Sequence, residues 1–481
     1  MALKVYNRFT GRKEEFKPVE KGKVGIYFCG LTVQGKPHMG HMLAFVSGDI
    51  IRRYLLFKGY DVTYVQNFTD VDDKIIKKAN EEGIDFRELS ERNIDEYFNC
   101  ARLLGILPAD VYPKATEHID DIIELVRKLE EKGYAYESEG DVYFRVRKFK
   151  EYGKLSGRKI DDLKVGARIA AGENKEDPLD FTLWKAAKED EPAWDSPWGR
   201  GRPGWHIECS AMSMKYLGHT LDMHGGGEDL IFPHHENEIA QSESATGSNF
   251  VNYWMHNGLL NLRGEKMSKS TEHFFSIDEV NREFSGDVIR FYLISTHFRS
   301  RAEFSRELMR EAEAGLERIR NACIYLDECS GRAGDSDGSG KEGKAVKLAE
   351  ITDEVRDKFL RAMDDDFNSA EAVGHIFHLV REINRARSSP GIDLSEDAAV
   401  VKKLTDTMNM FNDILGLFSE GLPAAGYDIP EEVLKLVRKR EKARERKEFE
   451  EADALRDRIK EMGYIVEDSA EGSKVKPGTG E

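Results

Sequence analysis

The sequence predicts a protein of the α/β class, in which a parallel sheet is followed by helices and a small C-terminal module. Two apolar runs, 24–28 and 62–65, flank a stretch in which apolar residues recur at helical spacing from 39 to 54. Strand, helix and strand over about 45 residues make a parallel crossover unit. Helical spacing returns between 346 and 418, and a dense charged helix pair follows Pro430.

Length and composition exclude several classes of protein. The chain has 481 residues, of which 72 are basic and 89 acidic, so its formal net charge is −17. This length predicts three or four domains of ~100–200 residues, and a hydrophobic content of 40% excludes disorder as the dominant state. No apolar run reaches the ~20 residues of a membrane helix, and the first residues lack a signal-peptide core. We therefore expect a cytoplasmic protein without a membrane partner. The acidic balance argues against a nonspecific nucleic-acid coat.

Two shifts in composition mark boundaries along the chain. Residues 330–345 are Gly, Ser and charged side chains with almost no apolar content, which is typical of a flexible linker. A second boundary lies at 420–430. Upstream of both, the stretch 113–190 mixes helices with a hairpin predicted at 135–147, and we expect it to be inserted into the sheet domain.

The first candidate site is the sequence His38-Met39-Gly40-His41, which opens the first long helix directly after the first strand. Backbone N–H groups at a helix start favour anions, and two imidazoles three residues apart can donate to phosphate oxygens. Gly40 allows a flat ligand to approach the backbone closely. Taken alone, the motif is explained equally well by two surface histidines at a helix N-terminus.

The second candidate site is Lys266-Met267-Ser268-Lys269-Ser270, on a loop expected after a strand at 253–255. Two lysines three residues apart suit a loop that closes on a polyphosphate and neutralises charge developing in the transition state. A basic loop by itself is usually only a solvated one. The combination of the two motifs in this order carries more weight than either motif.

A metal site is the third candidate. The five cysteines are widely spaced and form no Cys-x-x-Cys pair, so a structural zinc site is not indicated. Cys29 lies at an expected strand end, where ligands of parallel sheets bind, Cys209 lies far downstream, and His234 and Glu238 share one face of a helix. Donors from three distant segments suit an active-site metal. The alternative is that the cysteines are core residues and His234 caps its helix.

At this point the sequence resembles the class I aminoacyl-tRNA synthetases, whose signatures are His-Ile-Gly-His and Lys-Met-Ser-Lys-Ser. Met39 stands where the family commonly has Ile. The segments RPGWHIECSAM (202–212) and HGGGEDLIFPHHENE (224–238) are similar to those of cysteinyl-tRNA synthetase, and so are 67–74 and 363–368. The resemblance runs from about Lys4 to Gly472.

The resemblance implies an enzyme that activates cysteine with ATP to cysteinyl-adenylate and transfers it to the 3′ end of tRNA(Cys). L-cysteine, ATP and tRNA(Cys) are then the partners, the cofactors are one Zn²⁺ per chain and Mg²⁺ with ATP, and the chain is a monomer. The domain order implied is a Rossmann-type catalytic domain at 1–112 and 191–275, an inserted connective subdomain at 113–190, a stem-contact region at 276–329, a helical bundle at 346–419 and an anticodon-binding module at 430–472.

The resemblance also assigns roles residue by residue. The catalytic residues are His38, His41, Lys266 and Lys269. The ATP contacts are His38, Gly40, His41, Gly225, Gly226, Gly227, Lys266, Ser268 and Lys269. The cysteine pocket is formed by Thr69, Trp205, His224 and Asp229, the last as partner of the ammonium group. The zinc ligands are Cys29, Cys209, His234 and Glu238. The anticodon contacts are Arg444, Phe449, Asp453, Arg456 and Asp468.

A zinc ion accounts for the selection of cysteine against serine, because a soft metal prefers a thiolate to a hydroxyl, and a separate editing domain is then unnecessary.

Three segments depart from the family pattern. Thr271-Glu272-His273 replaces Leu-Gly-Asn, Gln34-Gly35 replaces Tyr-Asp, and Ser473-Lys474-Val475 stands where many members place a Trp.

Two other functions are compatible with parts of this sequence. A ligase that passes activated cysteine to a small amino sugar resembles the catalytic half but lacks an anticodon module, which this chain has at 444–468. A degenerate, non-catalytic tRNA-binding relative should have lost signature histidines, lysines or zinc ligands, and all of these are present. The basic run 438–447 would otherwise be read as a solvated helix face.

Overall fold

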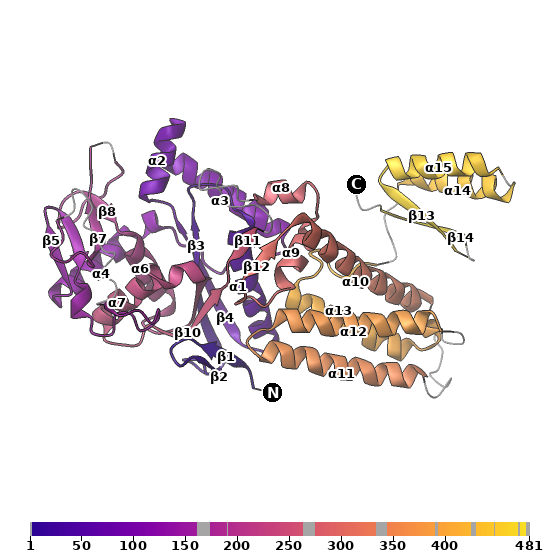
Figure 1. Ribbon diagram of the computed structural model, residues 1–481, viewed down its shortest axis with the longest axis horizontal. Coiled ribbons are helices and arrows are strands. Elements are labelled where there is room, and N and C mark those ends of the chain that lie inside the picture. Colours follow the sequence, from indigo (N-terminus) through magenta and orange to yellow (C-terminus); the bar gives the residue numbers. More distant parts are fainter. Residues whose placement is uncertain are drawn as a thin grey trace.

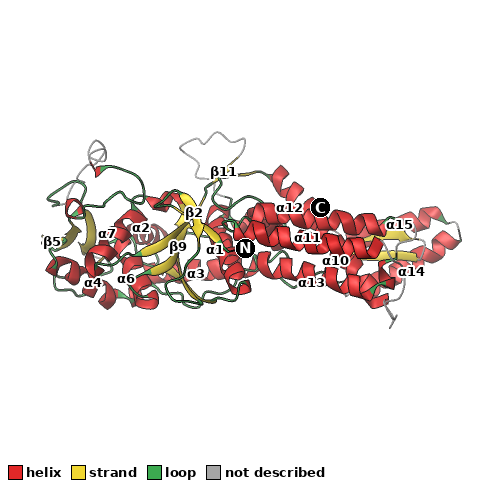
Figure 2. Ribbon diagram, turned by 90° about the horizontal axis from the view of Figure 1, so that it is seen from below, coloured by secondary structure: helices red, strands yellow, loops and turns green. Residues whose placement is uncertain are grey.

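The computed structural model describes residues 2–160, 174–189, 191–262, 275–332, 344–389, 393–424, 430–446, 448–469 and 472–477. A sheet domain, a helical bundle and a small C-terminal unit follow one another along the longest axis of the molecule (Figure 1). The same order is seen in the perpendicular view of Figure 2. Within the described part of the chain, no helix combines the length and hydropathy needed to cross a membrane.

A four-stranded parallel sheet forms the centre of the first half. Its strands are β3 (Lys23–Thr32), β4 (Asp61–Thr69), β9 (Leu221–Gly227) and β10 (Val251–Asn257), in the order β10-β9-β3-β4. Helix α1 (Met39–Phe57) connects β3 to β4, and α7 (His234–Thr246) connects β9 to β10. The two crossovers lead away from each other, so β3 and β9 form the switch point of the sheet, where ligands of such folds bind.

Strand β3 differs from its expected form. It does not end at Cys29 but continues to Thr32, and its register with β4 shifts between Phe28 and Leu31. The cause is a bulge at Cys29 and Gly30, where a Cβ atom on Gly30 would lie 1.5 Å from the carbonyl oxygen of Asn67. Cys29 is therefore positioned by a bulge within the strand and not by the strand end, which corrects the expectation from sequence.

Both faces of the sheet are covered by helices. The ring of Phe28 packs where Gly48 of α1 leaves room, whereas its neighbour Tyr27 faces Cys209 on the opposite side. Successive side chains of a strand point to opposite faces, so α1 covers one face and α6 (Trp205–Leu217), which carries Cys209, covers the other.

The inserted segment forms an antiparallel sheet of its own. The predicted hairpin is present as β5 (Ala135–Ser138) and β6 (Asp141–Phe144), and β7 (Phe181–Ala186) extends it. The sheet is completed, in the order β5-β6-β7-β8, by β8 (Gly201–Pro203), which lies beyond the boundary expected at 190. Strand β8 leads directly into α6. The other elements of the first half are β1 (Lys4–Asn7), β2 (Arg12–Glu15), α2 (Asp73–Glu82), α3 (Phe86–Leu103), α4 (Ile119–Glu131), β11 (Leu260–Leu262), α8 (Ile277–Asn281), α9 (Gly286–Ile294) and β12 (Ala302–Phe304).

The helical bundle agrees with the apolar spacing read from the sequence. It contains α10 (Arg306–Arg332), α11 (Lys344–Asp364), α12 (Ser369–Arg387) and α13 (Ala398–Leu415). Helix α10 precedes the predicted linker and packs against α12 and α13. The buried side chains of the sheet domain and the bundle form one continuous hydrophobic core from Leu3 to Phe418.

The C-terminal unit has a separate small core. It consists of α14 (Glu431–Glu445), α15 (Phe449–Glu461) and the antiparallel pair β13 (Tyr464–Ser469) and β14 (Gly472–Pro477). Val433, Val437, Ile459 and Val466 are buried in its interior. Figure 1 shows this unit beside the far end of the bundle, on the side away from the sheet domain, and in the view of Figure 2 it overlaps that end.

Candidate functional site

Four potential metal donors converge beneath the switch point of the sheet. Cys29 comes from β3, Cys209 from α6, and His234 and Glu238 from successive turns of α7. One donor atom from each residue lies within 4.8 Å of the other three, and all four side chains are buried. The structure therefore brings together the four residues that the sequence predicted as zinc ligands.

The spacing of these donors matches a tetrahedral zinc site. Zn–S bonds of ~2.3 Å and Zn–N bonds of ~2.0 Å place tetrahedral ligand atoms roughly 3.3–3.8 Å apart. The Sγ atoms of Cys29 and Cys209 are 3.9 Å apart, and Cys29 Sγ lies 3.8 Å from Oε1 of Glu238. His234 Nε2 lies 3.1 Å from the same Oε1 atom. The donor set of two sulfurs, one nitrogen and one oxygen fits zinc in both geometry and softness.

A second set of donors shares two of these residues. Nε2 of His235 lies 3.4 Å from Cys29 Sγ, and Nε2 of His224 lies 2.9 Å from Oε2 of Glu238. We favour the first set as the metal site, because it has both thiols and because His234 contacts the ring of Trp205, which is 38% exposed. His224 then acts as a neighbour that orients the Glu238 carboxylate.

The electrostatics of the first set favour the anionic form of two donors, Cys209 and Glu238. Hydrogen bonding from Cys29 lowers the pKa of the Cys209 thiol to about 6. Burial by itself would raise the pKa of Glu238, but the charges of His224 and His234 hold it at about 2. Burial raises the pKa of Cys29 well above its usual value. This thiol must release its proton when a cation binds.

The expected cysteine-pocket residues surround this cluster. Thr69 is the last residue of β4 and is buried, and its side chain hydrogen-bonds to Glu208. Trp205 is the first residue of α6, with its ring centroid 4.4 Å from that of His234. His224 is fully buried on β9, while Asp229 is exposed on a short helical turn after this strand. Trp205 and His224 thus contact the metal donors, and Thr69 is bonded to Glu208, the chain neighbour of Cys209.

The three glycines of β9 have a packing role that the sequence did not indicate. A Cβ atom on Gly225 would lie 2.1 Å from the ring of Phe28, and one on Gly226 would lie 2.9 Å from Leu230. A Cβ atom on Gly227 would lie 2.3 Å from Oδ1 of Asp229. The buried Phe28 ring therefore requires glycine at position 225, in addition to the adenosine contact expected there, whereas the clashes at 226 and 227 are with the ends of flexible side chains.

The two histidines of the first signature form one compact unit at the start of α1. His38 is the N-cap residue, and the rings of His38 and His41 stack with their centroids 3.5 Å apart. Nδ1 of His38 accepts the backbone N–H of His41 at 3.3 Å, and Nδ1 of His41 accepts the N–H of His38 at 3.4 Å. Because both Nδ1 atoms accept, the proton of each neutral ring is on Nε2.

Burial keeps these two rings neutral in the free protein. It lowers the pKa of His38 to about 4, and burial together with the neighbouring His38 lowers the pKa of His41 to about 3. At neutral pH the histidines therefore offer N–H donors and not fixed positive charges. A neutral N–H donor binds most strongly when negative charge accumulates on the phosphate in the transition state. It therefore lowers the activation barrier more than a fixed positive charge that already pairs with the bound substrate.

The second signature, with Lys266, Ser268 and Lys269, lies outside the described residues. The described chain stops on β11 at Leu262 and resumes at Phe275. The carbonyl oxygen of Phe275 accepts the backbone N–H of Met39 at 3.2 Å, and Ser276 forms an antiparallel bridge with His38. The chain that follows the second signature is thus bonded to the first signature.

The expected anticodon residues lie in the C-terminal unit. Phe449 opens α15 with 62% of its surface exposed, although it is a large aromatic side chain. Arg456 forms an ion pair with Asp453 at 3.3 Å, one turn apart on the same helix. Arg444 is exposed near the end of α14, and Asp468 is paired with Ser473 between β13 and β14. The five residues come from all three parts of this unit.

Sequence reasoning missed several buried groups beside the donors. Nδ1 of His235 lies 2.8 Å from Nε2 of His256, and Trp254 stacks on His224. Glu208 is buried with Oε2 unpaired, and burial raises its pKa well above the usual range. The sequence signal for these groups was the high density of polar residues in 234–242. The structure buries this part of α7 on every side, so its polar side chains must find hydrogen-bond partners inside the protein.

Comparison with protein families divides the chain into three matches. Residues 15–314 match the family described as "tRNA synthetases class I (C) catalytic domain". Residues 358–419 match the "DALR domain". Residues 427–475 match the "Cysteinyl-tRNA ligase anticodon binding domain".

Curated relatives match over nearly the whole length. The cysteine–tRNA ligase of Caldicellulosiruptor saccharolyticus is 49% identical, with 98% of this chain and 99% of the relative covered. The cysteine–tRNA ligase of Halalkalibacterium halodurans is also 49% identical, and both chains are covered fully. That of Geobacter sulfurreducens is 48% identical over 99% of this chain and 100% of the relative.

Solved structures support the fold. A methionyl-tRNA synthetase of Mycobacterium tuberculosis in complex with methionyl-adenylate superposes with a TM-score of 0.63 at 16% identity, covering 83% of this chain and 92% of that one. A putative arginyl-tRNA synthetase from Campylobacter jejuni gives a TM-score of 0.57 at 13% identity, covering 83% and 94%. The α/β fold predicted from the sequence is confirmed by these neighbours.

Proposed function

We propose that this chain, which belongs to the cysteine–tRNA ligase family of class I aminoacyl-tRNA synthetases, selects its amino acid with one zinc ion held by Cys29, Cys209 and the His234–Glu238 pair. The family predicted from the two signatures is confirmed. The enzyme joins cysteine to tRNA at the expense of ATP, and the proposal concerns how its residues do so.

The convergence of the four donor atoms carries the proposal. Cys29 and Cys209 are 180 positions apart, yet their Sγ atoms are 3.9 Å apart without forming a disulfide. Two thiols, an imidazole and a carboxylate, all buried within 4.8 Å of one another, form a donor set suited to a bound cation. When bound, zinc supplies a soft position that accepts a thiolate in preference to a hydroxyl.

The surrounding residues complete the selection of cysteine. The thiol of free cysteine has a pKa near ~8.5, whereas a serine hydroxyl does not ionise in this range, so only cysteine presents an anionic side-chain atom. We assign Thr69, Trp205 and His224 to the wall around the substrate. Asp229 is assigned to its ammonium group.

The first chemical step is assigned to the two signatures. The cysteine carboxylate attacks the α-phosphate of ATP, the bond to the bridging oxygen breaks, and pyrophosphate leaves with Mg²⁺. The Nε2–H groups of His38 and His41 donate to the crowded phosphoryl oxygens, and Lys266 and Lys269 neutralise the leaving pyrophosphate. Gly40, Gly225–Gly227 and Ser268 border the nucleotide.

The second step needs no nucleophile from the protein. A hydroxyl of the terminal ribose of tRNA attacks the carbonyl carbon of cysteinyl-adenylate, and AMP leaves. The C-terminal unit is assigned to the anticodon of tRNA(Cys), with Phe449 as a stacking platform for a splayed base and Arg444 and Arg456 as charged partners. The match of 427–475 to an anticodon-binding domain argues against the amino-sugar ligase.

Metal analysis of purified protein tests the zinc proposal directly. We expect one zinc per chain in the wild type, loss of zinc and of cysteine-dependent ATP–pyrophosphate exchange in Cys209→Ala, and neither loss in Cys323→Ala. Cys323 is the matched control because it is a buried cysteine on α10, far from the site in sequence and in the fold. Retention of zinc by Cys209→Ala would refute the donor set.

A second experiment tests the role of the ion in selection. Charging of tRNA is measured with cysteine and with serine, before and after treatment with a strong zinc chelator. Cysteine charging should fall with the zinc content, and serine should not be charged at a comparable rate by the zinc-loaded enzyme. Equal charging with serine would contradict selection by the metal. The monomeric state and the cytoplasmic location remain predictions.

A further inference from the structure

Helix α1 joins the phosphate-binding end of the enzyme to the helical bundle. It has 19 residues and is therefore ~28 Å long. His41 lies in its first turn, and Tyr54 and Lys58 lie at its other end, where both reach Asp364 of α11 at 2.7 and 2.9 Å. The helix that carries a signature histidine is thus held at its far end by the bundle.

The middle of α1 is held by a single arginine. Arg290 of α9 is 1% exposed and lies 2.5 Å from Oδ2 of Asp49. Its Nε donates to the carbonyl oxygen of Leu415 at 2.8 Å, and Nη1 donates to that of Leu104 at 3.0 Å. These carbonyls end α13 and α3, so one buried guanidinium caps two helices while it is paired with a third.

The C-terminus of α13 is shaped to receive this guanidinium. Gly416 caps α13 with a positive φ of 61°, and a Cβ atom there would lie 2.7 Å from the Arg290 guanidinium. Arg53, which also pairs with Asp49 at 2.8 Å, donates to the carbonyl oxygen of Asp413 at 3.3 Å. Two arginines therefore attach the end of α13 to α1.

The turn between α11 and α12 makes the other half of the junction. Asp366 and Phe367 adopt φ angles of 65° and 55°, which side chains rarely occupy. The Asp366 carboxylate accepts from Arg299 at 2.7 Å and from the backbone N–H of Tyr6 at 3.0 Å. These contacts hold the turn in a backbone conformation that it would not adopt by itself.

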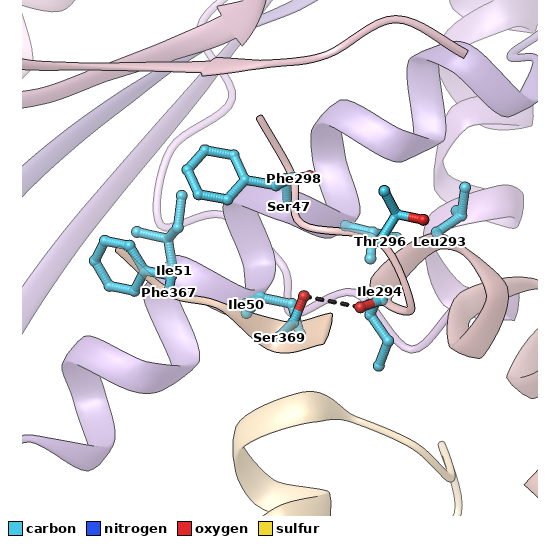
Figure 3. Close-up of a pocket in the computed structure, with 10 residues that line it drawn as sticks. Ser47, Ile50, Ile51, Leu293, Ile294, Thr296, Phe298, Phe367 and Ser369 are labelled. Carbon is cyan, nitrogen blue, oxygen red and sulfur yellow. Dashed lines mark hydrogen bonds between the residues drawn. The ribbon is translucent and has the colours of Figure 1, made fainter. Parts of the chain in front are cut away.

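The space between these contacts is filled by side chains. Figure 3 shows Phe367 and Ser369 beside Ile50 and Ile51 of α1, with Ser369 donating to the carbonyl oxygen of Ile294 at 2.8 Å. The remaining cavity has a volume of about 10 Å³, too small for any ligand. The junction is a close-packed contact and not a binding site.

The junction lies between the two parts of the enzyme that a tRNA must reach. The bundle separates the sheet domain from the C-terminal unit along the long axis (Figures 1 and 2). The bundle precedes the C-terminal unit in the chain, so its orientation on the sheet domain sets the point at which that unit is attached relative to His38 and His41. The proposed function assigns amino-acid activation to residues of the sheet domain, whereas charging of tRNA also engages the C-terminal unit.

We propose that Arg290 is a positioning residue for tRNA charging, which fixes the bundle on the sheet domain so that one tRNA reaches the catalytic site and the C-terminal unit together. Once tRNA is bound at one of these two places, its binding at the other is effectively intramolecular. The resulting gain in affinity is lost when the catalytic site and the C-terminal unit are no longer held at a distance that matches the tRNA. The inference rests on the tRNA-charging activity of the family and is independent of zinc.

The variant Arg290→Lys tests this role, because it keeps the charge but loses the planar fork that reaches Asp49, Leu415 and Leu104 at once. Three rates are compared with those of the wild type: cysteine-dependent ATP–pyrophosphate exchange, charging of full-length tRNA(Cys), and charging of a minihelix that contains only its acceptor stem. We expect kcat/KM for full-length tRNA to fall about tenfold or more, while exchange and minihelix charging stay within about twofold. The advantage of full-length tRNA over the minihelix should shrink accordingly.

Two further variants distinguish positioning from folding. Gly416→Ala places a Cβ atom against the Arg290 guanidinium without altering a charge. It should therefore lower kcat/KM for full-length tRNA while leaving exchange and minihelix charging unchanged. Lys402→Ala removes an exposed ion pair with Asp406 on the same helix and should change none of the rates. Equal losses for both RNA substrates, or no loss for either, in Arg290→Lys and Gly416→Ala would overturn the proposal. A wild-type enzyme that charged no tRNA would instead refute the proposed function.

Discussion

The backbone N–H of Met39 donates to the carbonyl oxygen of Phe275 at 3.2 Å. Met39 is the first residue of the helix that carries the first signature, and Phe275 is the first described residue after the second signature. The adjacent bridge between His38 and Ser276 extends this contact. The chain that follows the second signature is thus bonded through its backbone to the residues that open α1.

The variant Lys269→Ala tests the second signature. The lysine is expected to neutralise the charge that develops on pyrophosphate as it leaves, so its removal should lower cysteine-dependent ATP–pyrophosphate exchange by about 10²-fold. The change should appear mainly in kcat, because the interaction strengthens in the transition state. An exchange rate equal to that of the wild type would show that this lysine has no part in activation. Lys402→Ala serves as the control.

The variant His38→Asn separates the two roles of this histidine. Asparagine is a good N-cap residue, so the start of α1 and the thermal stability should be retained. The ring Nε2–H that faces the phosphate is lost, and exchange should fall by about 10²-fold. His118→Asn provides the comparison, because His118 also precedes a helix but makes no capping bond with its side chain. A large loss of stability with normal exchange per folded molecule would reverse the interpretation.

The ion pairs of Asp49 predict that the free energy of unfolding decreases at acid pH. Burial alone would raise the pKa of this carboxyl, but Arg290, Arg53 and the backbone N–H of Leu107 hold it below its ordinary value of 3.8. A carboxyl whose folded-state pKa is depressed stabilises the native state fully above its unfolded pKa. That contribution is lost as the pH falls below about 4 toward the folded value.

The Asp49→Asn variant measures this contribution. It leaves Arg290 buried without a counter-charge, so we expect a loss of about 3–5 kcal/mol in the free energy of unfolding near pH 7. The difference from the wild type should be constant between pH 5 and 8 and should shrink below pH 4, where Asp49 itself becomes protonated. Denaturant unfolding at a series of pH values provides the measurement. A difference that grows as the pH falls would contradict the assignment.

Two glycine-to-alanine variants should have opposite effects. Gly225→Ala forces a Cβ atom against the Phe28 ring and should destabilise the protein by about 1–3 kcal/mol. Gly374→Ala lies on the exposed face of α12, where nothing lies within 4 Å of the new atom, and should stabilise it by about 0.5–1 kcal/mol. Thermal unfolding compares both with the wild type. Normal stability of Gly225→Ala would show that β9 moves to admit the side chain.

Local features of the fold could be predicted because they depend on residues close in the sequence. The apolar spacing of 39–54 located α1, and the i, i+4 relation of His234 and Glu238 placed both on one face of α7. Strand ends were less accurate. Cys29 was expected to end its strand, whereas β3 runs on to Thr32. The bulge responsible arises from pairing between strands, which no single strand encodes.

The sequence by itself determined the family and the signature residues, because these are written as short motifs, and the resemblance to that family identified the four zinc-ligand candidates. The tertiary structure decided that Cys29 and Cys209 meet at 3.9 Å, that His235 offers a competing donor, and that Arg290 connects four helices. These relations depend on the register of parallel strands and on helices packed across them. The packing free energy that fixes these contacts is gained only when segments distant in the sequence are buried together.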